Sequence, residues 1–304
     1  MKTSFMKFLC TVLLGLGLAI TVFPSHGDET ALPAEPETQS AATESVQAQV
    51  EKESAEIMVE KRRKILADAT AAVAETEKAL TALEQGKTDD ALAALEVATG
   101  KLELILVREP ALALAPISTE IVTVDLLSSS ETVKAVIKEA EDYLKKGEIQ
   151  KARPLVANLA SEIVFRTTSI PLGTYPAAIK AITPLIDAGK FGEAKAALQA
   201  ALNTLVVTTD DVIPLPKLRA DWLLTSAEAL ANNEERTNED NEMLADLLNE
   251  ARCQLQLAEL LGYGTKKSYK PIYEQLDQIE AKTKGGKAGA GWFDKIKKQM
   301  QDLI

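Results

Sequence analysis

A polar segment flanked by apolar residues is the part of this sequence best suited to bind a small molecule. Its guanidinium and hydroxyl groups can donate and accept hydrogen bonds to a polar ligand. A second arginine and a tryptophan follow another β-branched stretch, and they would join the segment if the two stretches pair. The predicted ligand-binding residues are Arg166, Thr167, Thr168, Tyr175, Arg219 and Trp222. In the alternative interpretation, Arg166 offsets the acidic charge of the chain and the threonine hydroxyls belong to strand edges.

Histidine chemistry is excluded if the N-terminus is removed as an export signal. Two lysines precede an apolar run at residues 8–22, and the small residues Ser25 and Gly27 fit a cleavage site. We therefore predict a signal peptide at residues 1–27 and a periplasmic location for the remaining chain. His26, the single histidine, would be lost with the signal. Its loss excludes Ser-His or Cys-His catalysis and His-ligated zinc or haem.

The carboxylates form no recognisable metal site or catalytic pair. Asp210 and Asp211 offer oxygen ligands, as does the cluster at residues 238–242, but neither has the loop spacing of EF-hand calcium sites. Turn formation explains the first pair, and helix capping by Thr237 and Asp240 explains the second. We predict no metal, no cofactor and no enzymatic activity. A hydrolase that uses two close carboxylates is the alternative left open.

The segment after the predicted cleavage site is polar and poor in large apolar side chains. Such a composition buries too little surface to offset the entropy of ordering, so we predict a flexible leader at residues 28–53. Cleavage would also leave Cys253 as the only cysteine, and no disulfide could then form within the chain. Cys253 lies on a helical face beside leucines, which predicts a buried and unreactive thiol.

Apolar residues at helical spacing predict a helical domain at residues 54–264. The stripe from Val59 to Leu80 repeats every seven residues, which predicts one long helix that ends at Gly86. A second helix follows and ends before Pro110. The two apolar stripes predict an antiparallel hairpin.

Glycine turns recur along this domain. Gly86, Gly147 and Gly189 each lie between two helical patterns, and an alanine follows each glycine five residues later. The unequal intervals between the glycines argue against a solenoid and favour related hairpins in a bundle. Three other stretches favour β structure, at residues 121–124, 163–170 and 205–213. The predicted fold class is mainly α, with antiparallel helical hairpins in a bundle and a small two- or three-stranded β element.

The last part of the chain, residues 265–304, is basic, whereas the rest is acidic. It carries nine lysines and five acids, and residues 28–264 carry 40 acidic and 23 basic residues. We expect the acidic body to repel nucleic acid and anionic lipid. A glycine-rich tether leads into a C-terminal amphipathic helix, whose predicted partner-binding residues are Trp292, Phe293, Ile296, Met300 and Leu303. Docking of this helix on its own bundle is the favoured alternative, and membrane contact is considered for this helix only.

Several short phrases in the middle and C-terminal parts of the chain occur together and in order. They are Ile163–Leu172, Thr174–Pro176, Ala200–Thr209, Val212–Pro216, Leu260–Gly264 and Gly291–Asp294. With these phrases the sequence resembles the YfdX family from about Glu60 to the C-terminus. The resemblance implies a bacterial, exported, mainly helical protein that forms oligomers and is linked with tolerance to stress, including acid and drug stress. It also implies small-molecule binding or chaperone-like action, and it carries over no catalytic residue.

We therefore expect a periplasmic, non-catalytic protein that forms a homo-oligomer and binds a small hydrophobic ligand or apolar segments of client proteins. The alternative is a structural or adaptor module. In that case the helices would assemble an oligomer, and the tail would recruit a membrane partner.

Overall fold

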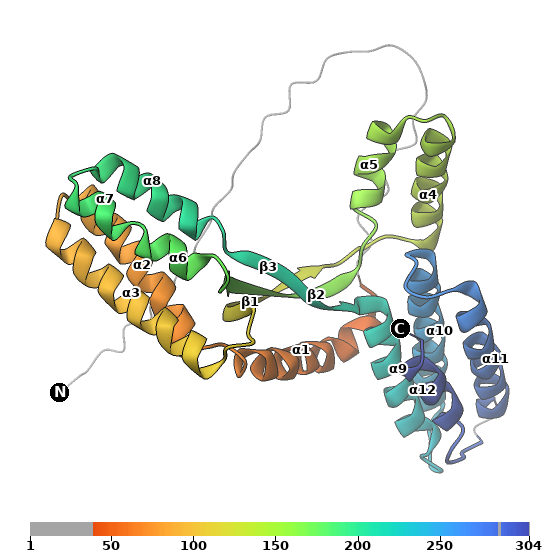
Figure 1. Cartoon of the computed structure of the whole chain (residues 1–304). Coiled ribbons are helices and arrows are strands. Elements are labelled where there is room, and N and C mark those ends of the chain that lie inside the picture. Colours follow the sequence, from red (N-terminus) through yellow and green to blue (C-terminus); the bar gives the residue numbers. More distant parts are fainter. Residues whose placement is uncertain (1–38, 285–286, 304) are drawn as a thin grey trace, which may run out of the picture. The chain divides into compact units, whose positions relative to one another are not determined.

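The structure, a computed structural model, describes residues 39–284 and 287–303. The predicted signal peptide and the start of the predicted leader, residues 28–38, lie outside these residues. Within them the chain is mainly helical and forms one sheet of three antiparallel strands (Figure 1). The predicted fold class is confirmed, and the β element has three strands.

The described helices and strands follow one another along the chain with short connections. In order they are α1 (Ala41–Arg62), α2 (Ala67–Glu84), α3 (Thr88–Arg108), β1 (Leu114–Val124), α4 (Ser130–Lys145), α5 (Ile149–Ala157), β2 (Glu162–Pro171), α6 (Tyr175–Lys180), α7 (Thr183–Asp187), α8 (Phe191–Leu202), β3 (Val206–Pro214), α9 (Leu215–Ala231), α10 (Asn238–Leu260), α11 (Lys266–Thr283) and α12 (Asp294–Gln301).

The predicted leader is wrong from Ala41 onward, because α1 begins there. The hydroxyl of Ser40 caps the helix by accepting a hydrogen bond from the Thr43 amide at 3.1 Å. Val46 and Val50 are buried against other helices and the sheet. Tertiary burial therefore orders a segment that its own composition would leave flexible.

The single long helix predicted up to Gly86 is in fact two helices. The chain leaves the helix after Arg62 and starts α2 at Ala67. At the break, the amide of Leu66 donates a hydrogen bond to the carbonyl of Pro116 at 2.9 Å, so the sheet fixes the bend. A heptad pattern does not distinguish one helix from two whose apolar faces are in phase.

The sheet has the order β1-β2-β3, with both pairs antiparallel. Phe165 in the middle strand lies opposite Ile121 on one side and Asp211 on the other. The register shifts between Phe165 and Arg166, where the pairing with β3 is irregular. Side chains alternate between faces along a strand, so Phe165 and Thr167 are buried while Arg166 is not.

Three helical hairpins close through the same turn. Gly86, Gly147 and Gly189 all have positive φ, at 72° or 73°, a conformation that costs glycine little. The amide after each glycine donates to the carbonyl five residues earlier, as in a Schellman cap: Lys87 to Ala82, Glu148 to Tyr143 and Lys190 to Leu185, each at 2.9 Å. The glycine repeat in the sequence is therefore a repeat of turn geometry.

Three apolar clusters hold the described chain together. The first joins α2, α3, α6, α7 and α8 with the ends of β1 and β2. The second joins α9, α10, α11 and α12 with the start of α1, and the third is a small cluster of α1, β2, β3 and α9. The α4–α5 hairpin contributes no residue to any of the three. Of the helices in this part of the chain, none is long and apolar enough to span a bilayer.

Candidate functional site

The predicted ligand-binding residues do not meet in one pocket. Arg166 is half-buried and lies opposite Glu120 of the adjacent strand β1, with 3.9 Å between the charged atoms. Thr167 is buried and donates a hydrogen bond to the carboxylate of Asp210, and its neighbour Thr168 is half-buried. In this geometry Arg166 is a charge near the surface, and the threonine hydroxyls lie between strands.

Tyr175 belongs to the first apolar cluster, away from the arginines. Its ring is fully buried, and its hydroxyl has no hydrogen-bond partner among the described protein atoms. Burial raises the pKa of this hydroxyl. The sequence alone did not separate Tyr175 from the polar segment, because only a few residues lie between them.

Arg219, a buried residue of α9, forms an ion pair with Asp125, the residue after β1. Arg219 is 3% exposed, and its guanidinium donates two hydrogen bonds to the carboxylate of Asp125, at 2.9 and 2.7 Å. Ser161 and Gln39 also donate to the Asp125 carboxylate, both at 3.1 Å. Burial alone would raise the pKa of Asp125, but these donors outweigh it and hold the pKa below its usual range. The pair anchors the end of β1 to α9.

Trp222 and the acidic pair in β3 are likewise parts of the framework. Trp222 is half-buried beside the second and third clusters, and its indole donates a hydrogen bond to Glu53 of α1 at 3.0 Å. Asp210 and Asp211 both pair with Lys61 of α1. No group of three metal-ligating side chains occurs within residues 39–284 and 287–303.

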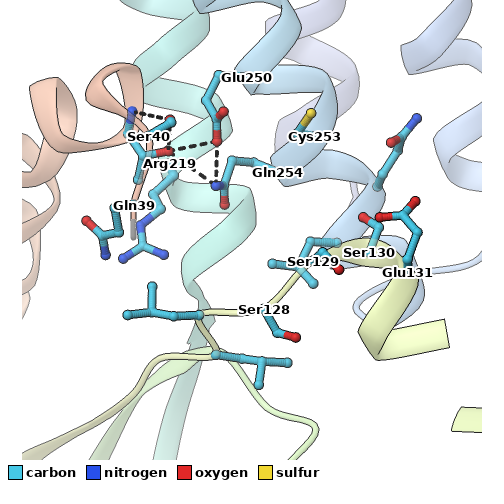
Figure 2. A pocket seen from close by; sticks show the side chains of 15 residues that line it. Gln39, Ser40, Ser128, Ser129, Ser130, Glu131, Arg219, Glu250, Cys253 and Gln254 are labelled. Atoms are coloured by element: carbon cyan, nitrogen blue, oxygen red, sulfur yellow. Dashed lines mark hydrogen bonds between the residues drawn. The ribbon is translucent and has the colours of Figure 1, made fainter. Parts of the chain in front are cut away.

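A polar cavity of about 380 Å³ lies beside Arg219 (Figure 2). The start of α1, the segment before α4 and one face of α10 line it. Glu250 accepts hydrogen bonds from Thr43 at 2.8 Å and from Gln254 at 2.9 Å, so its carboxylate is engaged. Arg219 Nε and Gln254 Oε1 are buried here without a hydrogen-bond partner among the residues that the structure describes.

Cys253 also lines this cavity, and the prediction that it is buried was wrong. Its side chain is exposed because it lies beside Gln254 on the outer face of α10, not among the leucines. Partial burial and the nearby Glu250 raise the pKa of the thiol. The thiol therefore keeps its proton at neutral pH, which disfavours reactivity.

The residues predicted to bind a partner pack instead against their own chain. Phe293, Ile296 and Met300 are fully buried in the second cluster, and Leu303 is nearly so. Lys297 of α12 pairs with Glu228 of α9. Trp292 is partly buried, with the ammonium of Lys282 at 5.7 Å from its ring. In this structure α12 therefore docks on its own helical bundle, which was the favoured alternative to partner binding.

A second cavity, of about 680 Å³, is more apolar than the first. It is a groove between the start of α1, the last part of α9 and the first half of α10, and we call it the α1/α9/α10 groove. Its lining is Ala41, Ala42, Ser45, Ser226, Ala229, Leu230, Glu239, Glu242, Met243, Asp246 and Leu247. Sequence reasoning missed this groove because α1 is far along the chain from α9 and α10, and the three helices meet only in the folded protein.

The middle of the chain matches a known protein family. Residues 72–211 match the family model described as YfdX protein. This segment, a little under half of the chain, is a YfdX-family domain. The match covers α2 to β3 and is narrower than the resemblance expected from about Glu60 to the C-terminus.

Similarity to solved structures is weak. A structure of YfdX from Salmonella Typhi is similar at 16% sequence identity and a TM-score of 0.33, over 50% of this chain and 92% of that chain. No curated protein matches the chain. The α9 and α10 walls of the groove lie after the segment that matches YfdX.

Proposed function

We propose that this chain is an exported, non-catalytic binding protein of the YfdX type that takes a small hydrophobic ligand in the α1/α9/α10 groove. The size of the groove carries the proposal, since about 680 Å³ lies within the range of small-molecule sites. Apolar side chains form most of its walls, and Met243 is 56% exposed beside it. Methionine adapts to ligands of different shape because its side chain is unbranched and polarisable.

Binding is favoured over catalysis by the state of the reactive groups. The carboxylates of Asp125 and Glu250 accept hydrogen bonds from neighbouring side chains, and the thiol of Cys253 has a raised pKa. None of the three is poised to act as a base or nucleophile beside the polar cavity. Linkage with acid or drug stress, and binding of client proteins in the same groove, are proposed from the family alone.

Export rests on the N-terminal pattern of two lysines, an apolar run and small residues before position 28. We propose cleavage after Gly27 and a periplasmic location. N-terminal sequencing of the protein from a periplasmic extract tests this, and the expected first residue is Asp28. Recovery of the intact chain in the cytoplasmic fraction would contradict it.

The ligand proposal is tested with 1-N-phenylnaphthylamine, an uncharged probe whose fluorescence rises in apolar surroundings. Saturable binding to the purified protein is expected. Ala229 is an exposed residue in the wall of the groove, so Ala229→Trp should fill the groove and abolish binding. Ala196→Trp, at an exposed site on α8, should bind as the parent does. Absence of saturable binding, or equal binding by Ala229→Trp, would overturn the proposal.

The α4–α5 hairpin supports a second candidate, an oligomeric or adaptor function. Leu144, Ile149 and Val156 are 51%, 62% and 51% exposed, and they belong to no apolar cluster of the described chain. Residues 130–157 carry six basic and five acidic residues, so two copies of the hairpin would not repel each other. A second copy of this chain is the partner that we propose for this face.

Sedimentation equilibrium tests this second candidate. The double variant Ile149→Ser with Val156→Ser should lower the mass of the assembly, whereas Val107→Ser, at a 77% exposed site on α3, should not. A monomeric parent protein, or an unchanged mass in the double variant, would contradict it.

A further inference from the structure

The rim of the α1/α9/α10 groove is acidic along one edge. Glu239, Glu242 and Asp246 all belong to α10, and their spacing of three and four residues places them on one face of the helix. None of the three forms an ion pair or a side-chain hydrogen bond with the described residues. Of the five residues of α10 that line the groove, these three are the charged ones.

Helix capping does not account for this edge. Glu239 lies in the first turn of α10, where an acid stabilises the helix dipole. Glu242 and Asp246 lie beyond the first turn, where that effect has fallen away, and the capping box of this helix uses Thr237 and Asp240 instead. The charge on the rim is therefore in excess of what the helix needs.

The described lining of the groove carries no positive charge. Among residues 39–284 and 287–303, no lysine or arginine lines it, and the remaining walls are apolar side chains with two serine hydroxyls. A ligand that fills it would leave water with its apolar body and meet carboxylates at one edge. An anionic ligand would be repelled there, and a neutral one would gain nothing from the rim.

We propose that the ligand of the α1/α9/α10 groove is a lipophilic cation, an organic ammonium with an apolar body. This inference rests on the proposed function, because it assigns a ligand class to the same groove. The apolar body contacts Leu230, Met243 and Leu247, and the ammonium faces Glu242 and Asp246. The rim carboxylates are exposed, so their attraction for the ammonium is screened by salt.

Two probes with the same dodecyl tail test the inference. Dodecyltrimethylammonium carries a positive charge, and dodecyldimethylamine N-oxide has a similar head group without net charge at neutral pH. Both are titrated by calorimetry into the purified protein below their micelle concentrations. At low salt we expect the cation to bind about tenfold more tightly, the sum of several weak exposed charge contacts. The preference should shrink as salt is added.

Variants separate the charge from the groove itself. The double variant Glu242→Gln with Asp246→Asn should bind both probes with the same affinity, close to that of the N-oxide for the parent. The matched control Glu234→Gln with Glu235→Gln removes two acids outside the groove and should keep the preference. Ala229→Trp should bind neither probe.

The outcomes distinguish this inference from the proposed function. Equal affinities in the parent, with both lost in Ala229→Trp, would overturn the cation and leave the groove as a ligand site. A preference that survives in the Glu242→Gln, Asp246→Asn variant would also overturn the inference. Binding of neither probe would overturn both.

Discussion

The α2–α3 and α4–α5 hairpins share a turn but differ in what covers them. Gly86 and Gly147 have nearly the same φ, and the alanine five residues after each is buried in the seam between the two helices. Beyond the seam, α2 and α3 supply much of the first apolar cluster, whereas α4 buries only Val133 and Ala140 and α5 only Ala152.

The difference shows that the local pattern determines the hairpin, and that tertiary packing determines burial. The α2–α3 hairpin packs one apolar face against α6, α7 and α8, although Val97, Leu104 and Val107 of α3 stay exposed. The α4–α5 hairpin meets α10 but leaves Leu144, Ile149 and Val156 in solvent. We therefore expect binding surfaces where no other helix covers the apolar side chains of a repeated hairpin.

The largest expected effect compares a leucine in the second helix of each hairpin. Leu95→Ala should lower the free energy of unfolding by about 2–5 kcal/mol, because Leu95 is fully buried in the first cluster. Leu155 lies in α5, the second helix of the other hairpin, and is half-buried, so Leu155→Ala should lower the free energy of unfolding by about 1 kcal/mol or less. Urea denaturation measures both. Equal losses of unfolding free energy in the two variants would show that the α4–α5 hairpin is covered by another surface in solution.

The next effect concerns the root of the α4–α5 hairpin, where Asp125 precedes α4. Arg219→Ala should destabilise the protein by about 1–3 kcal/mol, because it removes two charged hydrogen bonds and leaves a half-buried carboxylate without its cation. Arg166→Ala is the control, since its ion pair with Glu120 is long, at 3.9 Å, and both side chains are in contact with solvent. Thermal or urea unfolding checks this. A loss no larger than in the control would mean that Asp125 does not hold the hairpin root.

The glycine turns should have similar effects in both hairpins. Gly86→Ala and Gly147→Ala each force a side chain into the left-handed region, at a cost of about 1 kcal/mol. No atom crowds either position, so the cost comes from the backbone alone. Urea unfolding of the two variants measures it. If Gly147→Ala alone has no effect, the α4–α5 hairpin unfolds separately from the rest.

The smallest expected effect is a change in how the free energy of unfolding depends on pH. The pKa of Asp125 is lowered in the folded protein, so its contribution to stability is present above an unfolded pKa of about 3.9 and is lost as pH falls through the folded value. Burial raises the pKa of Asp221, so its contribution has the opposite sign: it is present below the unfolded pKa and lost as pH rises.

Urea unfolding between acid and neutral pH checks this pair. Asp125→Asn should flatten the loss of stability in acid, and Asp221→Asn should raise stability at neutral pH. A steeper acid loss in Asp125→Asn would contradict the direction of its pKa shift.

Local signals in the sequence were sufficient for several elements. The capping box of Thr237 and Asp240 is present as predicted, because a cap depends only on residues close in sequence. The strands and the glycine turns were found for the same reason. The start of α1 was missed because Val46 and Val50 are ordered by contacts with distant helices.

The candidate site was much less predictable. The strand β2 was expected, but its register was not, and the register places Arg166 opposite Glu120 and away from Arg219. Cys253 was assigned to the wrong face of α10. The α1/α9/α10 groove depends on three helices that meet only in the folded chain, so no spacing along the sequence indicates it.

Hydrogen exchange with and without 1-N-phenylnaphthylamine tests most directly whether the groove, and not the uncovered hairpin, takes the ligand. The account predicts that the probe slows amide exchange in α9, in the first half of α10 and at the start of α1, and leaves α4 and α5 unchanged. Slower exchange confined to α4 and α5, or no change anywhere at saturating probe, would contradict it.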